Sequence, residues 1–167
     1  MKKLVCLVIC AMLLIVFNAP LAFAASPVYS NTAEVVQLFD KMGIKYSLQG
    51  MLDSDTEWIT LRNKGEECTY DIAIVFNSDN EEANIRVVSL IEYSEYTYAS
   101  VLQTINALNQ EVKWAKFYAL EDDKTIWVEM DVILREEDDS AEYVLEAVLH
   151  IAQIIDYAYP KLAVYAK

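Results

Sequence analysis

The sequence predicts an α+β domain in which helices cover one face of an antiparallel sheet, with the elements in the order α-β-β-β-β-α-β-β-α. Two observations support this fold class. Apolar residues recur at helical spacing in three segments and alternate with polar residues in six others. Short polar turns join consecutive alternating segments, which is typical of antiparallel neighbours. The chain has only three glycines and three prolines, so we expect no linker and a single domain over residues 31–167.

Residues 1–24 have the layout of a secretory signal peptide. A positively charged start precedes an apolar run over 4–17, and Ala22 and Ala24 occupy the −3 and −1 positions of a cleavage site. The run is shorter than the roughly 20 residues that a bilayer span needs. We therefore expect export to the periplasm or the cell exterior, no stable membrane span after cleavage, and a short arm over residues 25–30.

Two alternatives concern the same segment. An uncleaved N-terminal anchor would retain the leader, and lipidation at Cys10 would need a preceding small residue that the sequence lacks. Cleavage after Ala24 would remove Cys6 and Cys10 and leave Cys68 as the only cysteine. We therefore expect no disulfide within the exported domain.

The first helix is expected to begin at Asn31, its N-cap, and to end before Gly43. Asn31 precedes a glutamate by three residues, a variant of the capping box. Gly43 suits the left-handed residue that follows a helix, and Ile44 can pack back on Phe39 in a Schellman motif. The apolar residues at helical spacing are Val35, Leu38, Phe39 and Met42.

Four strands are expected next, and the clearest of them shows strict alternation. In that strand Tyr70, Ile72, Ile74 and Phe76 share one face. Polar turns separate the four runs. The expected strands span 45–52, 57–62, 68–76 and 84–93.

A second helix, two further strands and a last helix complete the predicted domain. The second helix spans 97–110, and an acidic turn at 121–123 joins strands over 112–120 and 124–134. Acidic residues at 136–139 are favourable next to the positive N-terminal end of the last helix. We expect Pro160 to end that helix. The buried stripes are expected to contain Val101, Leu102, Ile105 and Leu108 in the second helix, and Val144, Val148, Ile151 and Ile155 in the last.

This order, together with local motifs, resembles the YbjN family. The stretch INALN at 105–109 leads into WAKFYAL at 114–120, and MGIKY at 42–46 and AYP at 158–160 are further matching features. The resemblance covers residues 31–162. That family is described as bacterial sensory transduction regulators, and its fold is similar to that of type III secretion chaperones. The resemblance therefore implies a regulatory domain of chaperone-like fold.

Composition and motifs exclude several classes of function. The formal net charge of −13 would repel a phosphate backbone, so we expect no nucleic-acid partner. A lone His150 and a lone Cys68 supply neither a supported nucleophile nor a zinc cluster. Asp53, Asp55 and Glu57 have calcium-loop spacing, but the required glycine and glutamate are missing from positions 6 and 12. We expect no catalytic residue, no metal and no cofactor. A secreted hydrolase that uses acidic residues remains the alternative.

The aromatic residues indicate a binding face. Trp58, Trp114 and Trp127 share the polar-side parity of their strands, opposite the strongly apolar side, and Arg62 and Tyr118 share that parity. Clustered aromatics on the uncovered side of a sheet mark interaction sites. The alternative is that these rings cover a sheet end or belong to the core. We predict that this face binds a polypeptide partner or a second copy of the chain.

Overall fold

The computed structural model describes residues 27, 29–50, 55–79, 81–134 and 139–167. Within them it confirms the predicted α+β class and the order of elements. The leader expected at 1–24 lies outside the described residues. The helices are α2 (Ser30–Met42), α3 (Tyr98–Glu111) and α4 (Ser140–Leu162), and the strands are β1 (Ser47–Gly50), β2 (Thr56–Lys64), β3 (Thr69–Asn77), β4 (Glu82–Glu92), β5 (Lys116–Leu120) and β6 (Thr125–Ile133).

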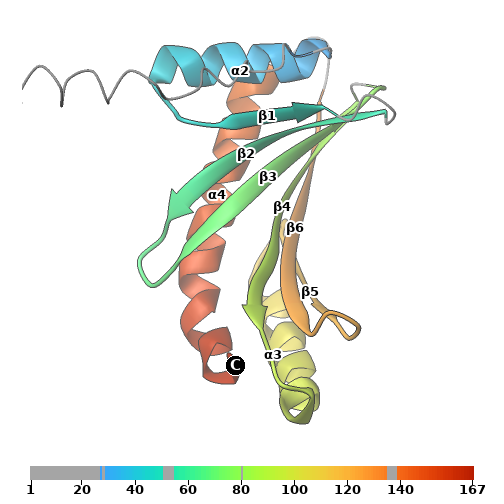
Figure 1. Cartoon of the computed structure of the whole chain (residues 1–167), viewed down its shortest axis with the longest axis vertical. Coiled ribbons are helices and arrows are strands. Elements are labelled where there is room, and N and C mark those ends of the chain that lie inside the picture. The colour runs from blue at the N-terminus through green and yellow to red at the C-terminus, as the bar shows by residue number, and fades with distance from the viewer. Residues whose placement is uncertain (1–26, 28, 51–54, 80, 135–138) are drawn as a thin grey trace, which may run out of the picture.

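The six strands form one antiparallel sheet in the order β1-β2-β3-β4-β6-β5. The first four strands form a meander. The chain then passes through α3 to the far edge, and the β5–β6 hairpin places β6 beside β4 (Figure 1). The β4–β6 register shifts between Val87, which pairs with Val128, and Ile91, which pairs with Ile126. Extra β4 residues therefore bulge opposite a single β6 residue.

The core lies between the sheet and the helices, which share one side of it (Figure 1). Helix α4 packs along β4 and β6, α3 packs on β5, and α2 crosses α4 and contacts β2. Alternate strand residues and one stripe of each helix meet in a single buried cluster. Its largest side chains include Phe39, Phe76, Phe117 and Tyr93, which are fully buried. Burial of this apolar surface is the main stabilising contribution to the fold.

Helix α2 ends as predicted but begins differently. The N–H groups of Gly43 and Ile44 donate to the carbonyls of Asp40 (3.1 Å) and Phe39 (2.9 Å), and Gly43 has a φ of 70°. This is the Schellman arrangement expected at the C-terminus. Asn31 is not the N-cap, because helical geometry already begins one residue earlier.

A long-range contact fixes the start of α2 in place of the expected capping box. The backbone N–H of Tyr29, the N-cap residue, donates to Oε2 of Glu57 on β2 at 3.0 Å. Glu57 is only 4% exposed. A charged acceptor from a neighbouring strand thus stabilises the helix N-terminus, where negative charge is favourable.

Three other local expectations were wrong. Strand β5 begins at Lys116, so the segment from 112 to 115 is not part of it. Pro160 lies inside α4, which continues to Leu162 because that side chain is fully buried in the core. Leu102 of α3 is exposed, whereas the rest of the predicted α3 stripe and the whole predicted α4 stripe are buried. No helix in the described ranges is long and apolar enough to span a membrane.

Candidate functional site

The outer face of the sheet is the side that points away from the helices. In β2 the inward residues Ile59 and Leu61 are buried, so Trp58, Thr60 and Arg62 point outward. The same alternation operates in β3, β4, β5 and β6. Four of the five residues predicted for the binding face lie on this outer face, namely Trp58, Arg62, Tyr118 and Trp127.

Three outward side chains form an apolar cluster across β4, β6 and β5. Tyr118 and Trp127 are direct cross-strand partners, and such aromatic pairs stabilise a sheet. Val88 follows the inward Val87 and lies in the β4 bulge opposite Trp127. Tyr118 is 45% and Val88 44% exposed. The register therefore places Val88, half-buried Trp127 and Tyr118 next to one another on three adjacent strands, and we call these three residues the apolar cluster.

Trp58 lies on the same face but at a distance from the apolar cluster. It is the cross-strand partner of Val75, and its Nε1–H donates to Oε1 of Gln49 on β1 at 2.9 Å. Three strand spacings separate β2 from β6, which is roughly 14 Å at the usual interstrand distance. The outer face thus has two aromatic regions instead of one continuous patch.

Polar side chains between these regions satisfy one another. Nη1 of Arg62 donates to both carboxylate oxygens of Asp71 at 3.0 Å. Asn84 donates from Nδ2 to Asp131 at 2.6 Å and accepts from Nε of Arg86 at 2.6 Å. An exposed ion pair of this kind adds little to stability. Because these groups are already paired, covering them costs less than covering unpaired polar groups.

The outer face is nearly neutral although the chain is strongly acidic. Its outward strand residues carry a formal charge of −1, whereas the whole chain carries −13. The cations are Arg62, Lys64, Arg86 and Lys116, and the carboxylates are Asp71, Glu82, Glu92, Glu129 and Asp131. Most of the excess negative charge therefore lies on other surfaces.

Trp114, the fifth predicted residue, does not join this face. It lies in the turn before β5 with a φ of 74° and is 76% exposed. A bulky residue with positive φ is uncommon. Trp114 instead lines a groove of about 410 Å³ together with His150, Ile154 and Tyr157 of α4. The strand-parity argument failed at this position because the strand does not extend to it.

An interaction network at the end of this groove joins α3 to α4. Nζ of Lys161 lies 2.7 Å from Oε2 of Glu111 and 3.9 Å from the centre of the Tyr157 ring. The Tyr157 hydroxyl donates to the same Oε2 at 2.8 Å and accepts from Lys161. The hydrogen bond from Lys161, followed by that from Tyr157, lowers the pKa of the Glu111 carboxyl. Sequence reasoning missed this network because its members are far apart in the chain.

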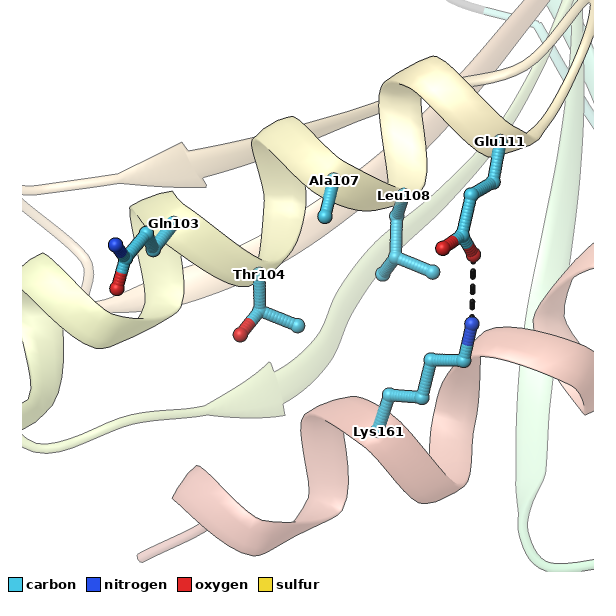
Figure 2. A pocket seen from close by; sticks show the side chains of 6 residues that line it. All are labelled: Gln103, Thr104, Ala107, Leu108, Glu111 and Lys161. Atoms are coloured by element: carbon cyan, nitrogen blue, oxygen red, sulfur yellow. Dashed lines mark hydrogen bonds and ion pairs between the residues drawn. The ribbon is translucent and has the colours of Figure 1, made fainter.

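A second groove of about 260 Å³ lies beyond this network, between α3 and α4. Figure 2 shows Thr104 and Leu108 of α3 facing Lys161 of α4, with Glu111 paired to the ammonium. The groove contains one ion pair and no further charged group. Its charge is already balanced within the fold.

The structure does not bring together the two residues considered for nucleophilic chemistry. His150 is exposed and lines the Trp114 groove, whereas Cys68 is half-buried and interacts with Tyr159. Burial, followed by the nearby charge of Asp156, raises the pKa of the Cys68 thiol. A raised pKa disfavours the reactive thiolate.

Acidic side chains gather at one further groove, of about 320 Å³, between α2 and α4. Glu34, Asp139 and Glu142 line it, and all three are exposed. Within the described ranges, no three His, Cys, Asp or Glu residues lie close enough to hold a metal ion. Asp53 of the calcium-like spacing lies outside those ranges.

Comparison with known proteins gives a matching family and solved structures of similar fold. The sequence model of the YbjN family, described as "putative bacterial sensory transduction regulator", matches residues 32–162. The crystal structure of YbjN from E. coli, titled "a putative transcription regulator", is similar with a TM-score of 0.55 and 14% identity. The similarity covers 83% of this chain and 96% of that one. No curated protein sequence matches the chain.

Proposed function

We propose, since this chain belongs to the YbjN family of bacterial sensory transduction regulators, that it is an exported regulatory domain which binds a polypeptide through the outer face of its sheet. The family assignment supports the regulatory role. Export, the absence of catalysis and the binding face are the added parts of the proposal.

The apolar cluster is the observation that carries the binding face. Val88, Trp127 and Tyr118 adjoin one another on an outer face that has no described helix packed on it. Exposed apolar clusters with a polar surround are typical of protein interaction sites. Since the neighbouring Arg62 and Asp71 already pair with each other, a partner could cover them without leaving a buried unpaired charge.

Export rests on the leader-like sequence of residues 1–24. The intact mass of protein recovered from the periplasm or the medium tests it directly. We expect the mass of a chain that begins at Ala25. A recovered protein that retains the leader would contradict cleavage. If the protein is missing from both the periplasm and the medium, export is contradicted.

Partner capture with matched variants tests the binding face. Tagged wild-type protein, Tyr118→Ala and Tyr143→Ala are used to isolate interacting polypeptides from the host cell envelope, which mass spectrometry then identifies. Tyr143 is a suitable control because it is similarly exposed, at 50%, but lies on α4. We expect Tyr118→Ala to reduce the captured partner about tenfold, a typical effect of truncating an interface anchor. Equal capture by both variants would show that the outer face is not the binding site.

The hydrolase alternative has less structural support than the binding function. Carboxylates that act as general acids usually lie in apolar, water-poor surroundings that raise their pKa. Glu34, Asp139 and Glu142 form the most acidic described groove, but all three are solvent-exposed. We therefore propose a binding function for this domain and not an enzymatic one.

A further inference from the structure

We infer that the polypeptide bound at the outer face is a second copy of this chain, so that the domain is a face-to-face homodimer. The inference rests on the proposed function and specifies its partner. Charge, the protection of the sheet edges and the area of the face each support it.

Charge distribution favours association through this surface over others. After cleavage behind Ala24 each copy lacks Lys2 and Lys3 and carries a formal charge of −15 (11 Lys and Arg against 26 Asp and Glu), so two copies repel one another at long range. On the outer face, however, four cations and five carboxylates nearly cancel. Two copies can therefore bring these faces together with little local repulsion. Because the remaining repulsion is between surfaces exposed to solvent, added salt should strengthen the association by screening it.

The sheet edges are less suited to pairing with a second copy. At the β5 edge, the side chain of Asn109 on α3 accepts from the Phe117 N–H at 2.8 Å and donates to the Phe117 carbonyl at 3.0 Å. The two backbone groups of Phe117 that point away from β6 at the sheet edge are thus occupied. The opposite edge strand, β1, has only four residues. Short or covered edges disfavour strand addition between copies, which leaves the face as the available surface.

The face is large enough for a dimer of modest affinity. Six strands at about 4.8 Å spacing and six residues at about 3.3 Å rise give roughly 25 by 20 Å, or about 500 Å² per copy. The pair would bury about 1,000 Å², which is near the lower limit for a specific interface. We therefore expect a reversible dimer with a dissociation constant on the order of micromolar.

A two-fold axis across the strands would place the apolar cluster of one copy against that of the other. In this isologous arrangement each copy uses the same surface, and Trp127 and Tyr118 lie beside the axis toward the β5 end of the sheet. The aligned packing of two sheets, with strand directions within about 30°, allows their outward side chains to interdigitate. Tyr118 is therefore the most informative position to change.

Sedimentation velocity on protein expressed from its full coding sequence tests the inference. Wild type, Tyr118→Asp, Val88→Asp and the control Tyr143→Asp are compared from about 1 to about 300 μM, a range that spans the expected dissociation constant. We expect a concentration-dependent dimer for wild type and Tyr143→Asp, and at least about tenfold weaker association for the two outer-face variants. Raising the salt from about 50 to about 500 mM should tighten the wild-type dimer. Thermal unfolding checks that each variant is folded.

Two results would overturn the second-copy inference. The first is a wild-type protein that stays monomeric over the whole range. The second is a dimer that Tyr118→Asp and Val88→Asp weaken no more than Tyr143→Asp does. If wild type is monomeric but the outer-face change still abolishes capture of a different polypeptide, the second copy is refuted and the proposed binding face stands. If capture is also unaffected, both proposals fail.

Discussion

Replacing Asn109 by alanine should destabilise the domain, because this side chain forms hydrogen bonds with both the N–H and the carbonyl of Phe117 at the sheet edge. The Asn109 amide accepts from the Phe117 N–H at 2.8 Å and donates to its carbonyl at 3.0 Å, both in partly buried surroundings. A net hydrogen bond contributes about 1 kcal/mol, and each buried group left unpaired costs about 1–3 kcal/mol. We expect Asn109→Ala to lower the free energy of unfolding by about 2–4 kcal/mol.

Urea denaturation followed by circular dichroism measures this change. Asn106→Ala is the matched control, since Asn106 is an exposed residue on the same helix and should cost less than about 0.5 kcal/mol. Hydrogen exchange gives a local readout, because the Phe117 amide of Asn109→Ala should exchange faster relative to neighbouring β6 amides. An Asn109→Ala midpoint equal to that of the control, with unchanged Phe117 exchange, would refute the reasoning.

Three further outcomes are expected. Gly65→Ala should lower the free energy of unfolding by about 1–2 kcal/mol, because the added Cβ would meet the Asp156 carboxylate that accepts from the Glu66 N–H. Urea denaturation measures this change, and an unchanged midpoint would contradict it. The pKa of Glu111 is lower in the folded protein than in the unfolded chain. The ion pair of Glu111 with Lys161 therefore stabilises the fold at pH values above the pKa that Glu111 has in the unfolded chain. This stabilisation is lost as the pH falls through the pKa that Glu111 has in the folded protein. Wild type and Glu111→Gln should therefore differ in melting temperature at neutral pH and converge in acid, and a constant difference would disprove the linkage. Cys68→Ser should cost only about 1 kcal/mol, and loss of a covalent dimer on a non-reducing gel would instead indicate an intermolecular disulfide.

The sheet was predictable from sequence because the alternation of apolar and polar residues within each strand indicates which of its side chains are buried. Alternation in β3, for example, placed Tyr70, Ile72, Ile74 and Phe76 on the inner face, and all four are buried. Gly43 likewise predicted the end of α2, because a left-handed residue favours glycine. These features depend on local conformation and on a single apolar side.

The remaining features depend on how distant segments meet. Trp114 adopts a positive φ although neither glycine nor asparagine marks the position, so no local signal indicated that the strand had not yet begun. The contact between Tyr29 and Glu57 spans 28 residues, and that between Glu111 and Lys161 spans 50. Such contacts follow from helix docking, which periodicity within one segment does not specify.

The position of β6 beside β4 also affects the order in which the chain can fold. Asn84 of β4 and its partner Asp131 of β6 are 47 residues apart, so closing this central pair must wait for α3 and β5 to be synthesised. Until then, β1 to β4 form a meander whose β4 edge has no partner. Contacts of large sequence separation slow folding, and unpaired strand edges on incomplete chains promote aggregation. While the chain is incomplete, the unpaired β4 edge is therefore a site at which other strands can add, and arrival of the β5–β6 hairpin covers it.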